Sequence, residues 1–141
     1  KPYQEQTQLN VIDAAIAQPL DEKHISPLIM DIGIPKGRTF AALGDRVQKV
    51  GRTTGHTRGK ITQIEATVRV GYGGNKVAIF TDQLVAVGLE GKPMSAGGDS
   101  GSLVLDMDNY AVGLLFAGSQ TTTIMNPIEY VIATLGVELV T

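Results

Sequence analysis

The protein has 141 residues, of which 43% are apolar and 18% are charged, with a formal net charge of −2 and no cysteine. This length fits one domain with a packed core and excludes two complete domains. The near-neutral charge argues against nucleic acid as a partner, and no apolar run approaches the ~20 residues that cross a membrane. Without cysteine the chain has no disulfide, no thiol nucleophile and no cysteine-ligated metal.

Residues 1–44 are the less regular part of the sequence. Leu9–Ala17 predicts one strand, after which Pro19, Pro27 and Pro35 interrupt the chain. A lone strand cannot pair both of its edges, so we expect it to pair with a segment upstream, with another chain or with the rest of this one.

Residues 45–141 show short β-branched runs separated by glycine-rich turns, a pattern typical of an all-β fold. Hairpin connections between consecutive runs predict a six-stranded antiparallel barrel. The expected strands are Val47–Val50, Gly59–Val70, Lys76–Val87, Ser102–Asp106, Tyr110–Ala117 and Thr121–Met125.

The pattern changes to a helical period after the last strand. Asn126 is a suitable N-cap, proline at position 127 suits the first helical position, and Gly136 is a natural stop. The sequence therefore predicts a short helix at Pro127–Leu135 that docks on the barrel.

The sharpest chemical signal is the segment Gly97-Gly98-Asp99-Ser100-Gly101-Ser102. A serine between glycines can stand clear of the backbone, and glycines let successive backbone N–H groups form a nest for an oxyanion. A flexible loop between two strands would explain the same letters. The strand Ser-Leu-Val-Leu directly after the motif favours the catalytic interpretation.

Several segments, taken together and in this order, resemble the trypsin/chymotrypsin-like serine proteases, especially their bacterial streptogrisin-like branch. Residues 97–102 resemble the nucleophile motif, and Val112–Gly118 resembles the strand that lines the substrate cleft. Residues 50–61 resemble the first hairpin of the second barrel, and Val11–Ala17 resembles the segment with the catalytic aspartate. The resemblance implies that residues 1–44 hold the last strand of an N-terminal barrel plus a connector, and that residues 45–141 form the C-terminal barrel with its helix.

The resemblance also implies the roles of individual residues. Ser100 would attack a peptide carbonyl, and the backbone N–H groups of Gly98 and Ser100 would form the oxyanion hole. Asp13 would orient the catalytic histidine, although a solvated aspartate at a strand end is the simpler alternative. The carboxylate of Asp99 would hold the nucleophile loop in place and take no part in the chemistry.

The same resemblance outlines a pocket for the side chain that precedes the scissile bond. Met94 would form the floor of this pocket, and Phe116, Ala117 and Gly118 would form its wall. No carboxylate stands at the floor, so the pattern favours an apolar or small side chain over Lys or Arg. Loop packing for Met94 and ordinary core packing for Phe116 remain the alternative interpretation.

The chain departs from the family in its histidines. The family places the catalytic His before the Asp, whereas the two His of this chain, His24 and His56, both follow Asp13. We expect both to be exposed turn residues, and we expect no metal site and no cofactor. A serine without its base is a poor nucleophile, so we expect this chain to be an inactive fragment, separated by autoproteolysis or otherwise from an N-terminal segment that it needs as a partner.

Two functional hypotheses follow. In the first, the chain is part of a serine endopeptidase whose substrate is a peptide or protein. In the second, the barrel keeps the motif and binds a peptide or protein partner without cleaving it. In both cases strand edges left unpaired could drive self-association. Lys49, Arg52, Arg58 and Lys60 form a basic cluster that we interpret as a solvated hairpin.

Overall fold

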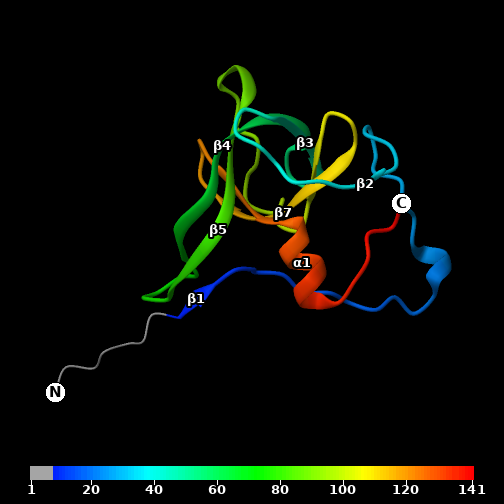
Figure 1. Cartoon of the computed structure of the whole chain (residues 1–141), viewed down its shortest axis with the longest axis horizontal. Coiled ribbons are helices and arrows are strands. Elements are labelled where there is room, and N and C mark those ends of the chain that lie inside the picture. The colour runs from blue at the N-terminus through cyan, green and yellow to red at the C-terminus, as the bar shows by residue number, and fades with distance from the viewer. Residues whose placement is uncertain (1–7) are drawn as a thin grey trace.

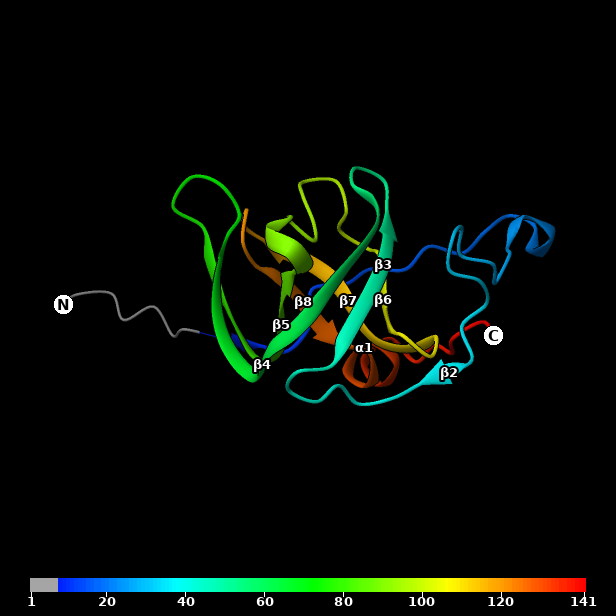
Figure 2. The same ribbon diagram turned by 90° about the horizontal axis from the view of Figure 1, so that it is seen from above.

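Six antiparallel strands form a closed ring in the computed structural model, which describes residues 8–141 (Figure 1). The ring runs in the order β3, β4, β5, β8, β7 and β6, and β6 pairs with β3 to close it. Figure 2 shows β4 and β5 on one side, β3 and β6 on the other, and β7 and β8 between them. The strands are β3 Arg46–Gly51, β4 Gly55–Gly71, β5 Val77–Gly88, β6 Leu103–Asp106, β7 Tyr110–Gly118 and β8 Thr123–Pro127. The prediction of an all-β ring of six strands is confirmed.

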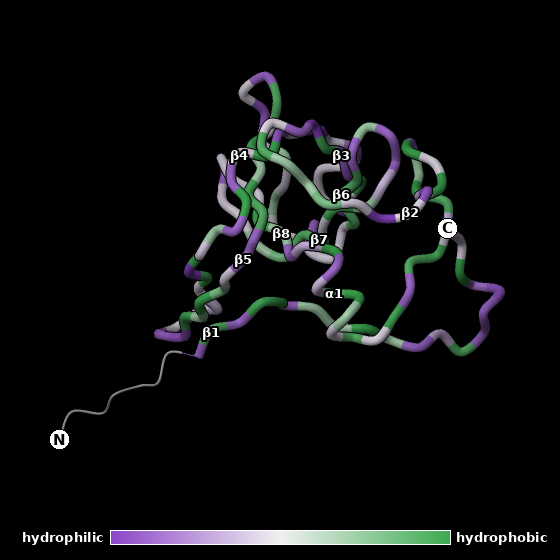
Figure 3. The backbone as a smooth tube through the Cα atoms, viewed as in Figure 1, coloured by the Kyte–Doolittle hydropathy of each residue, from purple (hydrophilic) through white to green (hydrophobic). Residues whose placement is uncertain are grey.

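Alternating side chains fill the inside of the ring. Hydrophobic and hydrophilic residues alternate along the second half of β4, whereas β5 has two apolar runs, 77–80 and 84–87, around a polar break at 81–83 (Figure 3). Burying each large apolar side chain completely contributes roughly 1.5–3 kcal/mol. The central cluster consists of Val47, Ile61, Leu84, Ala86, Met94, Val104, Val112, Leu115 and Met125.

Two short parallel strands attach the N-terminal segment to this ring. Strand β1 (Leu9–Asn10) pairs with β5, and β2 (Gly37–Arg38) pairs with β7. The longer strand expected at Leu9–Ala17 is therefore wrong beyond Asn10. Side chains take the place of a strand partner there, because the Gln83 amide donates to the Val11 carbonyl and the Asn126 amide accepts from the Asp13 N–H.

One short α-helix closes the chain. Helix α1 (Ile128–Leu135) begins one residue later than predicted, with Pro127 at its N-cap and no side-chain cap. Asn126 is not the N-cap, because its fully buried amide donates to Gln83 Oε1 at 2.7 Å and faces the N-terminal segment. Gly136 ends the helix as predicted: it adopts φ +63°, a left-handed conformation that glycine tolerates, and donates to the Ile132 carbonyl.

The segment between β1 and β3 contains one 3₁₀ turn, η1 (Glu22–His24), and a second such turn, η2 (Leu89–Gly91), follows β5. The division at residue 44 into the end of one barrel and the whole of another stays a prediction. From residue 8 onward, no helix combines the length and the apolar character that a membrane crossing requires.

Candidate active site

Ser100 is exposed on the loop that connects η2 to β6. Its hydroxyl lies 3.4 Å from the Phe116 carbonyl on β7, a long contact that leaves the oxygen open to solvent. Two residues earlier, Gly98 has φ +101°, and a Cβ there would lie 2.3 Å from Thr53 Oγ1. Only glycine fits this close approach, so the loop depends on the glycine that the motif supplies.

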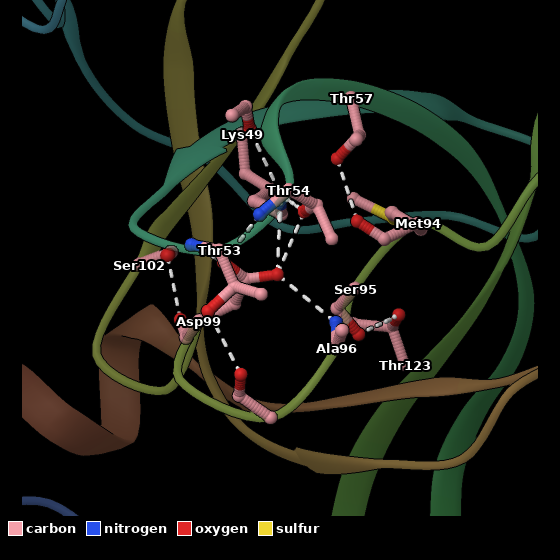
Figure 4. Close-up of polar contacts among 12 residues, drawn as sticks. Lys49, Thr53, Thr54, Thr57, Met94, Ser95, Ala96, Asp99, Ser102 and Thr123 are labelled. Carbon is pink, nitrogen blue, oxygen red and sulfur yellow. Dashed lines mark hydrogen bonds and ion pairs between the residues drawn. The ribbon is translucent and has the colours of Figure 1, made fainter.

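The loop is held by the buried carboxylate of Asp99, which is only 1% exposed. Asp99 Oδ1 accepts from the backbone N–H groups of Thr53 and Thr54, at 2.8 and 3.2 Å. Asp99 Oδ2 accepts from the Thr54 hydroxyl at 2.7 Å and from the Ala96 N–H at 2.9 Å (Figure 4). The structural role predicted for Asp99 is confirmed, because four donors from two segments converge on one carboxylate.

A buried lysine accompanies this carboxylate. Lys49 Nζ lies 3.7 Å from Asp99 Oδ2, and neither side chain is exposed. Burial lowers the pKa of Lys49, while the charge and hydrogen bonding of Asp99 oppose that shift. For Asp99 burial acts to raise the pKa, but the hydrogen bonds from Thr54, Ala96 and Thr53 outweigh it, and its pKa lies well below the usual range.

Two backbone donors beside Ser100 have no acceptor in this part of the protein. Among residues 8–141, neither the Gly98 N–H nor the Ser100 N–H donates a hydrogen bond to a protein atom. The neighbouring N–H groups of Asp99, Gly101 and Ser102 all donate to carbonyls. Both donors that the oxyanion-hole prediction names are therefore free within the described chain, as is the N–H of the preceding Gly97.

A pocket of about 360 Å³ opens beside Ser100. It is lined by Pro93, Ser95, Ala96, Gly97, Ser100, Leu115, Ala117, Gly118, Ser119 and Gln120. No lining residue is ionisable, and the hydroxyl of Ser95 is engaged with Thr123 at 2.6 Å. The pocket is thus a small neutral cavity with hydroxyl and amide groups at its rim.

The structure brings only part of the predicted pocket together. Ala117 and Gly118 line it, as does the serine itself. Met94 is 2% exposed and belongs to the central core, where its sulfur lies close to the position that a Cβ on Gly59 would take. Phe116 contributes its carbonyl to Ser100, and its ring packs against Phe80 with centroids 4.9 Å apart. Met94 thus packs in the core, whereas the alternative placed it in loop packing, and the half-buried Phe116 ring packs against a core residue.

Asp13 lies elsewhere in the described structure. Its carboxylate accepts a hydrogen bond from the Tyr72 hydroxyl, at the tip of the β4–β5 hairpin, and its N–H donates to Asn126. Within the part of the chain that the structure covers, no hydrogen bond joins Asp13 to the Ser100 loop. The Tyr72 pKa is raised, first by burial and then by the hydrogen bond and charge of Asp13.

Neither histidine reaches Ser100 by a hydrogen bond. His24 ends the exposed turn η1, while His56 is half-buried on β4 and its Nε2 lies 3.0 Å from Gln48 Oε1. The described residues also contain no group of three or more Asp, Glu or His side chains placed to hold a metal ion. The expectation of an exposed turn residue is wrong for His56, because this half-buried side chain contacts Gln48 on β3.

Lys49, Thr53 and Thr54 are site residues that sequence reasoning did not assign. Lys49 was grouped with the solvated basic cluster, which is wrong because its ammonium is fully buried. Strand alternation could have revealed this, since Lys49 shares its inward phase with the core residue Val47. Thr53 and Thr54 gave no comparable signal, because their role depends on a contact with a loop 45 residues away.

The fold of this chain is similar to that of solved bacterial serine proteases. The structure resembles Thermobifida fusca Protease A with a TM-score of 0.66 and 28% identity, over 82% of this chain and 61% of that one. It resembles Cellulomonas bogoriensis chymotrypsin with a TM-score of 0.64 and 25% identity, over 78% of this chain and 56% of that one. The chain thus spans about three-fifths of the length of these proteases.

No curated protein matches the chain significantly by sequence. A family model described as the Nal1 C-terminal domain matches residues 29–127, which include the complete ring and the Ser100 loop. That match covers most of the chain, and the resemblance to bacterial trypsin-like serine proteases rests on the same strands. The chain therefore belongs to the Nal1 C-terminal domain family, and its ring of strands has the fold of the C-terminal barrel of a trypsin-like protease.

Proposed function

We propose that this domain is the nucleophile-bearing barrel of a serine endopeptidase and that Ser100 attacks the scissile carbonyl. The observation that carries the proposal is the Ser100 loop itself. An exposed hydroxyl stands directly after a buried, fully bonded aspartate, beside a neutral pocket of about 360 Å³. A flexible linker would not need a buried carboxylate with four donors to hold it.

The free N–H groups of Gly98 and Ser100 support an oxyanion hole. A tetrahedral intermediate formed on Ser100 carries its negative charge on the former carbonyl oxygen. Preorganised donors at that position stabilise the charge, each by roughly 2.7–4 kcal/mol in proteases where a donor has been removed. The positive φ of Gly98 and the bonds to Asp99 fix the backbone that carries both donors.

The general base in this proposal is a histidine outside the described residues. Neither His24 nor His56 is placed to take the Ser100 proton. Asp13 would orient that histidine once its carboxylate exchanges the Tyr72 hydroxyl for an imidazole N–H. This 141-residue chain by itself would then be inactive, because an unassisted serine hydroxyl is hardly ionised at neutral pH.

The pocket favours a small or apolar neutral side chain in the substrate. Its lining offers Ala117, Gly118 and Leu115 without any ionisable residue. A Lys or Arg side chain would have to lose its hydration there without gaining a carboxylate partner. Ala or Leu before the scissile bond would avoid that cost.

The test uses a fluorophosphonate probe, which bonds covalently to activated serines, on the longest natural chain that contains these residues. We expect labelling of that chain and cleavage of peptides with Ala or Leu before the scissile bond. Ser100→Ala should abolish both, because the attacking oxygen is gone. Ser26→Ala, which removes a hydroxyl bonded only to a local backbone N–H, is the matched control and should keep both activities.

The same experiment separates this proposal from a binding barrel without catalysis. Unlabelled Ser100 in the long chain, together with peptide binding that Ser100→Ala leaves unchanged, would establish the non-catalytic alternative. Labelling that persists in Ser100→Ala would instead place the nucleophile at another residue.

A further inference from the structure

A second cavity of the described structure lies outside the Ser100 site. It has a volume of about 460 Å³ and is walled by β3, β4, the η2 turn and the β6–β7 turn. Its lining residues are Arg46, His56, Thr57, Arg58, Leu89, Glu90, Lys92, Pro93 and Met107. We call this cavity the basic pocket, because three of its side chains are permanent cations at neutral pH and one is an anion.

The cations of the basic pocket have no carboxylate partners. Within residues 8–141 the ion pairs are Arg38 with Glu129 and Lys49 with Asp99, so Arg46, Arg58 and Lys92 take part in none. Glu90 also lines the pocket but lies outside ion-pair distance of all three. The pocket therefore concentrates positive charge on a protein whose net charge is −2.

Strand geometry explains why these charges meet. Gln48 pairs with Arg58 and Arg46 pairs with Lys60 across β3 and β4. Opposite residues of an antiparallel pair lie on one face of the sheet, so Arg46 and Arg58 share a face. The η2 turn brings Lys92 to the same cavity, and its compactness depends on Gly88, where a Cβ would lie 1.7 Å from the Lys92 carbonyl oxygen. The three cations thus come from β3, from β4 and from the residue directly after η2.

His56 is oriented within the pocket by its contact with Gln48. The Gln48 side-chain amide donates to Asp106 O and Asn109 Oδ1, which leaves its Oε1 to accept from His56 Nε2 at 3.0 Å. The second ring nitrogen of His56 takes part in no hydrogen bond of the described structure. The imidazole is thus held on one side and available for a ligand on the other.

We propose that the basic pocket binds an acidic peptide segment that carries carboxylate and apolar side chains. Arg46, Arg58 and Lys92 supply donors for the carboxylates, since Arg–carboxylate hydrogen bonds are charge-assisted and geometrically selective. Leu89, Pro93 and Met107 supply apolar surface in the same cavity. The pocket is distinct from the candidate active site, although Pro93 borders both.

A peptide fits these observations better than a nucleic acid. Nucleic-acid binding relies on neutralising many phosphates, and the net charge of −2 opposes a long polyanion. The basic pocket also lacks a Phe, Tyr or Trp on which a base could stack, whereas it has three apolar side chains. Alternating carboxylate and apolar groups match the lining in both charge and polarity.

Fluorescence anisotropy with a short fluorescein-labelled peptide of alternating Glu and Leu tests the proposal on the 141-residue protein. We expect saturable binding that weakens as NaCl is raised, and weaker binding of the peptide with Gln in place of Glu. Arg46→Gln, Arg58→Gln and Lys92→Gln should each weaken binding by about three- to tenfold. Glu90→Gln should strengthen it, because the only carboxylate of the basic pocket is removed.

Arg69→Gln is the matched control, since Arg69 is an exposed and unpaired arginine on the outer part of β4. It should bind like wild type, and circular dichroism should show every variant folded. Ser100→Ala should also bind like wild type, which keeps this result independent of the proposed catalytic role. Equal loss in Arg69→Gln and the pocket variants would overturn the proposal. Binding of a single-stranded oligonucleotide but not of the peptide would overturn it too.

Discussion

The regions around Asp99 and Asp13 differ in how completely the described chain satisfies an aspartate. Asp99 is 1% exposed, accepts four hydrogen bonds and lies beside a buried lysine. Asp13 is half-exposed and accepts one side-chain hydrogen bond, from a tyrosine at a hairpin tip. The resemblance assigns both aspartates to one protease, yet only one of them has its full set of partners within the ring.

This difference shows which parts of the proposed site the ring can organise alone. Every partner of Asp99 lies on β3, on the β3–β4 turn or on the Ser100 loop, so this domain alone holds Ser100 and the backbone donors beside it in place. Asp13 lies on a segment that attaches to the ring through two short parallel strands and side-chain bonds. In the proposed mechanism, the orientation of a histidine by Asp13 is therefore the part that depends on further structure.

The largest expected effect comes from breaking the better-satisfied region. Asp99→Asn should lower the free energy of unfolding by about 3–5 kcal/mol, because it leaves a buried Lys49 charge unpaired and removes an acceptor from backbone N–H groups. Asp13→Asn, the matched control, should change it by less than about 1 kcal/mol. Urea denaturation of both variants measures the contrast, and equal losses would contradict it.

The contribution of Asp99 to the free energy of unfolding depends on pH. The pKa of Asp99 is lowered in the folded state, so its contribution to stability is complete above the unfolded value of about 3.9 and is lost as the pH falls below it. The difference in unfolding free energy between wild type and Asp99→Asn should therefore shrink as the pH drops from about 5 to 2. A difference that stays constant over that range would show that the Asp99 charge has no such role.

A smaller effect is expected from crowding the same carboxylate. A Cβ on Gly51 would lie 2.4 Å from Asp99 Oδ1, so Gly51→Ala must push the carboxylate out of its hydrogen bonds. We expect a loss of about 1–3 kcal/mol, as for overpacked sites in general. Gly71→Ala is the control, because a Cβ there meets nothing within 4 Å. In thermal unfolding, Gly51→Ala should have a lower midpoint than Gly71→Ala. Equal midpoints would show that the Asp99 site accommodates the extra methyl group without loss of stability.

The smallest effect should come from the region around Asp13. Tyr72→Phe removes the hydroxyl that donates to Asp13, but Tyr72 is 50% exposed and water replaces the lost partner, so we expect a loss below about 0.5 kcal/mol. The raised pKa of Tyr72 favours its neutral form, so this contribution is present below about pH 10 and disappears as the pH rises further. Urea denaturation of wild type and Tyr72→Phe at pH 8 and at pH 11 tests the size of this loss and its pH dependence. A loss as large as that of Asp99→Asn would contradict the difference between the two aspartate regions.

The ring of strands could be predicted from sequence because its signals are local. Alternation along the second half of β4, the apolar runs of β5 and the glycine-rich turns mark each strand within a few residues. The strand expected after Asn10 could not be corrected from sequence, because the Val11 carbonyl and the Asp13 N–H are bonded by Gln83 and Asn126 from distant strands. The N-cap expected at Asn126 failed for the same reason.

The sequence predicted the backbone loop of the candidate site better than the side chains around it. The resemblance names Gly98 and Ser100, and glycines around a serine are compatible with a loop that has free N–H groups, while their role as an oxyanion hole stays a prediction. Lys49 was missed because a lysine in a sequence suggests an exposed charge, and only the position of Asp99 in space explains its burial. The floor predicted from Met94 depended on the resemblance alone, and the side chain packs in the core.

The pairing of Leu9 and Asn10 with Ile79 and Phe80 has a consequence for handling the protein. Strand β8 pairs with β5 only at Leu84–Ala86, so the short strand β1 covers the edge of β5 farther along the hairpin. A preparation clipped by a protease after Asn10 would expose those backbone groups next to the Phe80 and Phe116 rings. Such a sample would have an unpaired strand edge, so we expect a purified stock to aggregate more readily once Leu9 and Asn10 are lost.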